Sequence, residues 1–255
     1  MPGDLLNLAA PPADARVAYG PHTCQFGELR FGKGERRDVI VMNIHGGFWR
    51  NRYDLVHAGH FCAALSNRGL TTWNVEYRRV GDDGGGWAGS IEDVRLAWGF
   101  VPELAARYKL RAEKVIVTGH SAGGQLALGL AAHEPAVRSV VSLAGVVDLR
   151  RAWELHLSSD AVAEFLGGSP EDVPQNYQAA DPMQLSIPQC AQVVIHGAAD
   201  ENVPPDFSRA YCERKKMLGE KVRLVEIPNA DHFDLIDPRS ASWTAVESSI
   251  LQFAD

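Results

Sequence analysis

Residues 115–124 have the sequence Val-Ile-Val-Thr-Gly-His-Ser-Ala-Gly-Gly, and the fold of the chain can be inferred outward from them. Its pattern is a short apolar strand, a sharp turn of the form Gly-x-Ser-x-Gly centred on Ser121, and the start of a helix. Gly119 and Gly123 remove the side chains that would clash where the strand and the helix approach each other. The helix N-terminus directs free backbone N–H groups toward the turn, where they stabilise negative charge. The stretch therefore predicts a serine held in an exposed position on a strand-to-helix turn.

Apolar runs and helical patterns alternate outward from this turn along the rest of the chain. We expect an edge hairpin within residues 23–31, and strands over 38–44, 70–77, 114–118, 137–144, 192–196 and 221–227. We expect helices over 57–68, 90–108, 122–132, 205–218 and 240–253. Ser90 is the expected N-cap of the second helix, with Asp93 three residues on. Strands that alternate with helices predict an α/β fold with a mostly parallel sheet covered on both faces.

The length of 255 residues fits a single α/β domain over residues 1–255. Residues 1–15 are rich in Ala and Pro, which predicts a loosely packed N-terminal arm. Residues 148–190 interrupt the alternation with short helical fragments and Pro-containing turns. We interpret this segment as a small, cap-like helical insertion over the carboxyl end of the sheet.

The net charge indicates which kinds of partner to expect, and the spacing of the cysteines indicates the compartment. The chain has 25 Lys and Arg against 32 Asp and Glu, a net charge of −7, which argues against nucleic acid or an anionic membrane as partner. The four cysteines form no Cys-x-x-Cys motif, as is typical of free thiols in a reducing compartment. The N-terminus lacks the basic and apolar regions of a signal peptide, so we expect a cytoplasmic protein. His57 and His60 lack the glutamate of a zinc helix, so no metal site is expected.

Polar residues follow four of the expected strands, at the ends that meet on one edge of a parallel sheet. Three of these ends carry Ser121, Asp200 and His232, in that chain order. A histidine can take the proton of a serine and return it to the leaving group, while a carboxylate holds the other ring nitrogen and fixes the tautomer. We therefore predict that Ser121 is a nucleophile, His232 its base and Asp200 the orienting acid. Other nearby carboxylates remain alternatives for the acid: Glu201, Asp206, Asp231 and Asp234.

The fourth strand end runs into His-Gly-Gly-Phe-Trp at residues 45–49. Acyl chemistry at Ser121 requires N–H donors for the oxyanion that develops, each contributing about 3 kcal/mol. Ala122 supplies one donor directly after the serine, and we predict that Gly47 and Phe48 supply the others, because glycine lets the backbone approach a ligand closely. The histidine that begins this motif is expected to brace the turn.

Three further residues are predicted to form the substrate pocket. Trp49 and Trp87 lie on loops expected to reach the sheet edge, where a large aromatic ring can form a flat wall for an acyl or aromatic group. Packing in the core is an equal alternative for Trp49. His120 is expected to line the pocket or to be packed beside it, as is His196, rather than to act in catalysis.

With these motifs in hand, the chain resembles the α/β-hydrolase superfamily over about residues 38–253. Within it, the chain is similar to the esterase/lipase branch that includes kynurenine formamidases (arylformamidases) and small carboxylesterases. The resemblance rests on His-Gly-Gly-x-Trp at 45–49, Gly-His-Ser-Ala-Gly-Gly at 119–124, Asp200 before Val-Pro, and His232 before Phe. Hormone-sensitive-lipase-like esterases carry a third glycine where this chain has Phe48. The resemblance implies ester or aryl-formamide hydrolysis through an acyl-enzyme, with no metal or organic cofactor.

We therefore expect a serine hydrolase that cleaves a carboxylic ester of a small acyl or aryl substrate. The insertion is too short for a large lipase lid, which favours small substrates. Kynurenine formamidase activity is the first alternative. A non-catalytic binding module with the hydrolase fold is the second, and the complete Ser, Asp and His set argues against it. The expected partner is a small molecule, not nucleic acid or a membrane, and the sequence indicates no oligomeric state.

Overall fold

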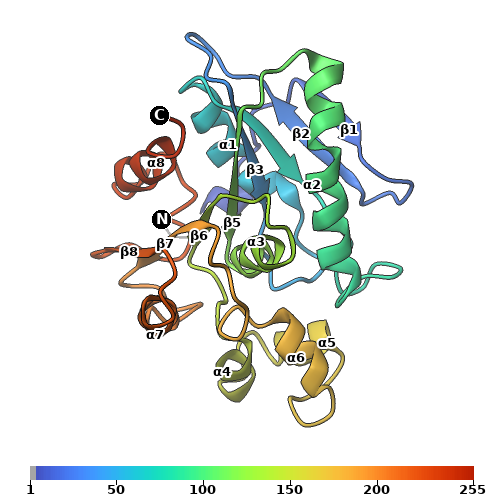
Figure 1. The fold of residues 1–255 in the computed structure, drawn as a ribbon, viewed down its shortest axis with the longest axis vertical. Helices are drawn as coiled ribbons and strands as arrows, with labels where there is room; N and C mark the ends of the chain where they lie inside the picture. The colour runs from blue at the N-terminus through green and yellow to red at the C-terminus, as the bar shows by residue number, and fades with distance from the viewer. Residues whose placement is uncertain (1–3) are drawn as a thin grey trace.

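The computed structural model describes residues 4–255, and within them eight strands form one sheet in the order β1-β2-β4-β3-β5-β6-β7-β8 (Figure 1). The strands are β1 (Ala15–Ala18), β2 (Phe26–Arg30), β3 (Val39–Ile44), β4 (Thr71–Val75), β5 (Lys114–His120), β6 (Ser139–Leu143), β7 (Ala191–Gly197) and β8 (Val222–Ile227). From β4 to β8 all neighbours are parallel, and the two antiparallel pairs are β1 with β2 and β2 with β4. The prediction of a mostly parallel sheet is confirmed.

Helices cover both faces of this sheet (Figure 1). The helices are η1 (Asp4–Asn7), η2 (Leu55–Ala58), α1 (Gly59–Ser66), α2 (Gly89–Tyr108), α3 (Ala122–His133), α4 (Leu149–Glu154), α5 (Ala161–Leu166), α6 (Pro174–Ala180), α7 (Asp206–Met217) and α8 (Trp243–Leu251). Side chains of α2, α3 and α7 join one hydrophobic cluster, and those of α1 and α8 join a second cluster. Among residues 4–255, no helix combines the length and hydrophobicity that a bilayer span requires.

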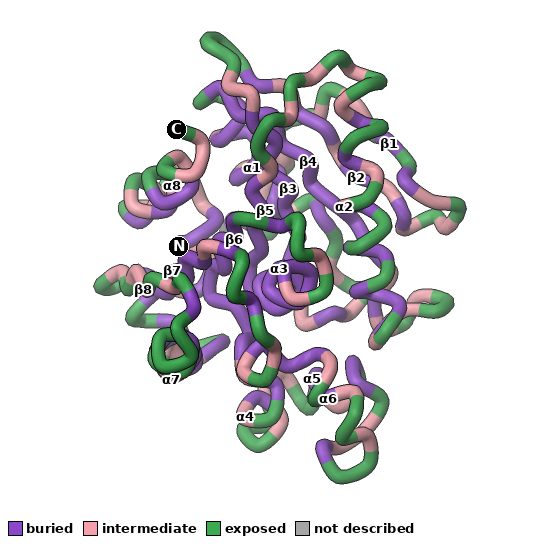
Figure 2. Tube along the Cα trace, in the orientation of Figure 1, coloured by how far each residue is buried: buried purple, intermediate pink, exposed green. Residues whose placement is uncertain are grey.

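β3, β4 and β6 are buried along their whole length because each face of the sheet meets a helical layer (Figure 2). Along β3, Ile40 and Met42 face the cluster of α2 and α3, while Val39 and Val41 face the cluster of α1 and α8. This alternation follows from the two-residue period of a strand, and it requires apolar residues on both faces. It explains why residues 39–42 of β3 are four successive apolar residues.

The order of the strands creates a crevice beside β3. The chain passes from β3 to β4 on one side, and then returns to place β5 on the other side of β3. Loops at the carboxyl ends of two such strands diverge, and ligands bind in the space between them. These two loops carry residues 45–54 and Ser121, so the fold places the predicted site at this crevice.

The insertion at residues 148–190 contains α4, α5 and α6, which lie together beyond one end of the sheet (Figure 1). Arg50, in the loop after β3, attaches this insertion to the site. Its guanidinium lies 2.6 Å from the Glu164 carboxylate, 3.1 Å from the Ser158 hydroxyl and 3.0 Å from the Ser159 carbonyl oxygen. The insertion is therefore held against the loop that follows β3.

Local expectations at two helical positions are wrong. Ala88, not Ser90, precedes α2, and Ser90 instead donates its hydroxyl to the Arg78 carbonyl oxygen at 2.6 Å. The Asp93 carboxylate binds the Arg78 guanidinium at 2.7 Å. Both side chains are buried against the loop before α2, because that contact satisfies them better than a cap would.

The expected arm at residues 1–15 and the expected hairpin at residues 23–31 both lie in the N-terminal region, and residues 1–3 of the arm are outside the described residues. Leu5 is only 2% exposed and joins the cluster of α1 and α8. The hairpin is formed by β1 and β2, and β1 lies before the expected range of residues 23–31. The other edge of β2 pairs with β4. β1 is therefore the edge strand.

Candidate active site

Ser121 lies on a strained turn between β5 and α3. Its backbone has φ +57° and ψ −120°, a region that non-glycine residues occupy at a cost of about 1–3 kcal/mol. A Cβ added to Gly119 would lie 2.1 Å from the carbonyl oxygen of Gly123. A Cβ added to Gly123 would lie 2.1 Å from the carbonyl oxygen of Ile44. Only glycine fits at these two positions, which confirms the close approach of strand and helix. The turn aims Ser121 into a pocket.

His232 follows β8, and its Nδ1 lies 2.7 Å from Oδ2 of Asp200, which follows β7. The other oxygen of Asp200 accepts hydrogen bonds from the backbone N–H groups of Asn202 at 2.8 Å and Val203 at 2.9 Å. Burial raises the pKa of the Asp200 carboxyl, but hydrogen bonds from His196 and His232 outweigh it and hold the pKa below its ordinary value. Asp200 is therefore an ionised acceptor fixed in orientation by its own loop.

A second histidine, His196, also faces Asp200, which sequence reasoning did not anticipate. Its Nε2 lies 2.9 Å from the Val203 carbonyl oxygen and 3.2 Å from Asp200 Oδ2. Because a carbonyl only accepts, Nε2 carries the proton, and Nδ1 accepts the Ser208 hydroxyl at 2.6 Å. His196 is fully buried and does not line the pocket, so it supports Asp200 from behind.

The alternative carboxylates are engaged elsewhere or exposed. Asp231 and Asp234 accept hydrogen bonds within their own turn, and Asp206 pairs with Arg209. Glu201 is exposed. Within the described part of the chain, Asp200 is the carboxylate that contacts the ring of His232. Asp200 is therefore distinguished from the nearby carboxylates by its hydrogen bond with His232 and not by its position in the chain.

The turn after β3 lies directly against Ser121. A Cβ added at Gly46 would lie 2.7 Å from the His120 carbonyl oxygen and 2.9 Å from the Ser121 Cβ. Gly47 and Phe48 both have positive φ, +112° and +50°. Over residues 4–255, no acceptor pairs with the backbone N–H groups of Gly47, Phe48 or Ala122, so these donors are open to a ligand.

His45 braces this turn from beneath, as expected. Its Nδ1 lies 2.8 Å from the Gly46 carbonyl oxygen, and its Nε2 lies 2.8 Å from Glu76 Oε1. The ring stacks on Tyr77 at 4.5 Å, and the Tyr77 hydroxyl donates to the His45 carbonyl oxygen. The Glu76 carboxylate also accepts the backbone N–H of Leu55 at 3.0 Å, so one buried group holds both ends of the loop.

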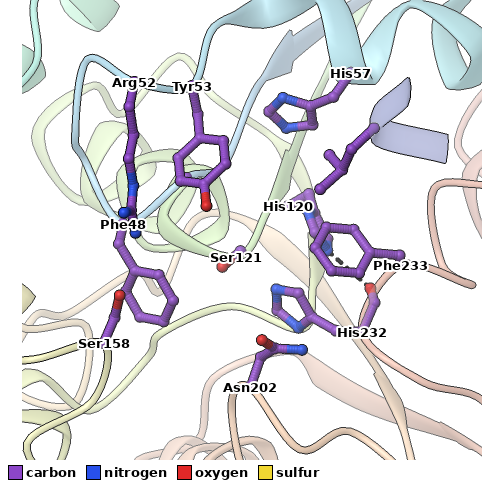
Figure 3. Close-up of a pocket in the computed structure, with 12 residues that line it drawn as sticks. Phe48, Arg52, Tyr53, His57, His120, Ser121, Ser158, Asn202, His232 and Phe233 are labelled. Carbon is purple, nitrogen blue, oxygen red and sulfur yellow. Dashed lines mark hydrogen bonds between the residues drawn. The ribbon is translucent and has the colours of Figure 1, made fainter. Parts of the chain in front are cut away.

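These elements enclose a pocket of about 240 Å³ (Figure 3). Gly47, Phe48, His120, Ser121 and His232, all named from the sequence, line it. Figure 3 shows the His232 ring beside Ser121. Sequence reasoning missed the remaining lining residues: Leu6, Arg52, Tyr53, His57, Ser158, Asn202 and Phe233. The position of Arg52 and Tyr53 just after the His-Gly-Gly turn was the one available signal.

Trp49 and Trp87 do not line this pocket, so the expectation that they form its wall is wrong, and for Trp49 the alternative of packing in the core holds. Trp49 is fully buried, stacks on Phe165 of α5 at 4.4 Å, and donates its Nε1–H to Gln125. The Trp87 ring meets the same Phe165 edge-on at 5.9 Å. The positive φ of Phe48 and Trp49 turns successive side chains apart, so the Phe48 ring faces the pocket instead.

Two histidines of the pocket are held in the neutral form. Burial, followed by the neighbouring His232, lowers the pKa of His120, and its Nε2 donates to the His232 carbonyl oxygen at 2.9 Å. Burial, followed by His45, lowers the pKa of His57 to about 3. In the part of the chain that the structure describes, no group of three or more His, Cys, Asp and Glu side chains is placed to hold a metal ion.

The chain is similar to a protein family, to esterases and to a kynurenine formamidase. The model of the BD-FAE family matches residues 32–214. The chain is 28% identical to esterase LipQ of Mycobacterium tuberculosis, covering 91% of this chain and 62% of LipQ. It is 26% identical to the kynurenine formamidase of Salmo salar, covering 81% of this chain and 73% of that protein. The chain thus spans less than two thirds of the length of its mycobacterial relative.

Solved structures share the fold. Esterase B from Lactobacillus rhamnosis superposes with a TM-score of 0.81 over 99% of this chain and 89% of that chain, at 17% identity. At this identity, the likeness concerns the arrangement of the elements rather than the chemistry of the site.

Proposed function

The chain belongs to the BD-FAE family and has the α/β-hydrolase fold, and from this premise we propose that it is a serine hydrolase of carboxylic esters of small acyl or aryl groups. One observation carries the proposal. Ser121 opens on its strained turn into the same pocket as His232, whose Nδ1 is hydrogen-bonded to Asp200 at 2.7 Å.

The proposed reaction has two steps, acylation of Ser121 and hydrolysis of the acyl-enzyme, and the same groups act in both. Ser121 Oγ attacks the acyl carbon as His232 Nε2 takes its proton, and the carbonyl oxygen becomes an oxyanion. The open N–H groups of Gly47, Phe48 and Ala122 receive that oxyanion. The C–O bond then breaks, and the alcohol leaves with the proton from His232. A water molecule repeats the sequence on the acyl-enzyme and releases the acid.

Pocket size supports a small substrate. A volume of about 240 Å³ lies below the usual 300–1,000 Å³ of sites for drug-sized ligands. The Phe48 and Phe233 rings on its lining provide apolar surface for an alkyl or aryl group.

Aryl-formamide hydrolysis is the second candidate. It is favoured by the similarity to a kynurenine formamidase and by the His-Gly-Gly-x-Trp motif at residues 45–49. The same groups would attack a formyl carbon and release an arylamine in place of an alcohol. Because Trp49 is in the core, the motif supports the shape of the oxyanion turn and not a direct substrate contact.

Labelling and a substrate panel test the proposal. A fluorophosphonate probe should label the folded wild type at Ser121 and leave Ser121→Ala unlabelled, because only an activated serine reacts. Failure to label would favour a non-catalytic binding module. p-Nitrophenyl esters of increasing acyl length should be hydrolysed with the highest kcat/KM at short chains. If N-formylkynurenine is hydrolysed with a higher kcat/KM than any ester, the formamidase candidate replaces the esterase.

A further inference from the structure

Arg52 lines the pocket from the loop that carries the predicted oxyanion donors. It lies between Gly47 and η2, and its guanidinium carbon sits 4.9 Å from the centre of the Tyr53 ring. Figure 3 shows the side chain extending along the pocket beside Tyr53. Stacking on an aromatic ring restricts the guanidinium to few orientations, so its donors are directed before any ligand binds.

The other arginines near this loop all have carboxylate partners. Arg50 pairs with Glu164 at 2.6 Å, Arg78 with Asp93 at 2.7 Å, and Arg79 with Glu76 at 3.0 Å. Nowhere in residues 4–255 does a carboxylate lie within salt-bridge distance of Arg52. A stacked arginine at a pocket without a partner leaves its five N–H donors for a ligand.

The described residues that line the pocket offer no negative charge to compensate Arg52. Among the described residues that line it there is no Asp or Glu, although the whole chain has a net charge of −7. The lowered pKa values of His57 and His120 keep their rings neutral at neutral pH. The Tyr53 hydroxyl, which also faces the pocket, has no hydrogen-bond partner within the described chain. Among the described lining residues, Arg52 therefore carries the one permanent charge.

We propose that Arg52 is a specificity residue that binds a carboxylate of the substrate, so that the preferred substrates are small esters bearing a free carboxylate. The inference rests on the proposed esterase function and names its substrate class. A guanidinium forms paired, charge-assisted hydrogen bonds with a carboxylate, and the Tyr53 hydroxyl is a further donor on the same side. The carboxylate is bound while the ester carbonyl lies at Ser121, and no bond to it changes in the reaction.

Two matched substrate pairs test this and report which part of the ester bears the charge. For the acyl side, the pair is p-nitrophenyl hydrogen glutarate and the neutral p-nitrophenyl valerate. For the alcohol side, the pair is p-acetoxybenzoate and its neutral methyl ester. In at least one pair, the wild type should have the higher kcat/KM for the carboxylate member. Arg52→Gln should lower that kcat/KM by about tenfold, and Arg52→Glu by more, with the neutral member changed by less than about twofold.

Arg111→Glu is the matched control for net charge. Arg111 is exposed and precedes β5 at the opposite end of the sheet, so the same change of charge there should leave both members of each pair unchanged. Arg52→Lys should keep part of the preference, because the charge remains while the paired geometry is lost. Circular dichroism melts establish that each variant is folded.

The outcomes separate the two claims. If the wild type hydrolyses the neutral esters but shows no preference in either pair, or if Arg52→Glu lowers charged and neutral members equally, the role of Arg52 is refuted while the esterase proposal stands. If a folded wild type hydrolyses no ester and is not labelled at Ser121, the proposed function fails and the substrate assignment falls with it.

Discussion

Replacing Asp200 by asparagine changes one atom of the proposed site and leaves its shape intact. Asp200 Oδ1 accepts the N–H groups of Asn202 and Val203, while Oδ2 faces His232 Nδ1 at 2.7 Å. The amide oxygen of the asparagine must stay opposite the two backbone donors, because a flip would set the NH₂ group against them. The NH₂ group therefore faces His232 and donates to Nδ1.

The magnitude follows from the tautomer that this contact selects. With Nδ1 as acceptor, the proton of His232 moves to Nε2, the nitrogen that must take the proton of Ser121. Loss of the base in this way lowers kcat by about 10⁴-fold, which is about 5.4 kcal/mol on the barrier. The new NH₂ group also meets the Nε2–H of His196, which lies 3.2 Å from Oδ2. An unsatisfied buried donor costs about 1–3 kcal/mol of stability, so the variant should still fold.

The assay is p-nitrophenyl ester hydrolysis under saturating substrate, with urea unfolding of the same preparation. Glu201→Gln is the matched control, since Glu201 is the adjacent, exposed carboxylate and should be neutral. A kcat of Asp200→Asn within about tenfold of the wild type would contradict this role of Asp200, because the wrong tautomer should lower kcat far more. A large loss in Glu201→Gln instead would move the acid role to that residue.

Four further substitutions probe other parts of the molecule. Burial lowers the pKa of His57 to about 3, below the ordinary histidine value. The unfolded chain therefore binds this proton more tightly than the folded chain, so the free energy of unfolding falls as the pH is lowered from the ordinary histidine pKa toward the pKa of the folded state. When the pH is lowered from about 7 to about 5, the free energy of unfolding in urea should fall by about 2 kcal/mol less in His57→Gln than in the wild type. An equal fall in both proteins would contradict this. Gly99→Ala, whose Cβ meets nothing within 4 Å, should stabilise α2 by about 0.5–1 kcal/mol, whereas Gly123→Ala, with its Cβ 2.1 Å from a backbone oxygen, should unfold at a lower temperature. Thermal melts compare the pair, and a Gly123→Ala variant as stable as the wild type would disprove the close packing. Trp49→Phe should lower the free energy of unfolding by about 1–3 kcal/mol without altering the order of kcat/KM across acyl lengths, and an altered order would place Trp49 at the substrate after all.

Local patterns determine most of what lies around Ser121. The Gly-x-Ser-x-Gly turn, the apolar run of β3 and the alternation of strands and helices each depend on neighbours within a few residues. The carboxyl ends of parallel strands must then meet, so the chain order of Ser121, Asp200 and His232 was enough to predict that they lie on one edge of the sheet.

The sequence alone does not show which of several neighbouring carboxylates contacts His232. Several carboxylates stand near Asp200 and His232 along the chain, and their spacing does not tell which one reaches Nδ1. That choice depends on two backbone N–H groups and on His196, which hold Asp200 in place. These contacts arise only once β7 and the following loop are packed.

Tertiary structure alone decided the lining of the pocket. Whether Trp49 or Phe48 faces the substrate depends on positive φ angles in a short turn and on Phe165, which an insertion more than a hundred residues later brings against Trp49. Arg52 is one of several arginines in the sequence near this loop, and only the folded chain shows that its neighbours are neutralised while it is not. Hydrophobic periodicity and turn chemistry act over a few residues and so can be read from the chain. The partner of each charged or aromatic side chain is set by contacts between distant segments, and those exist only in the folded protein.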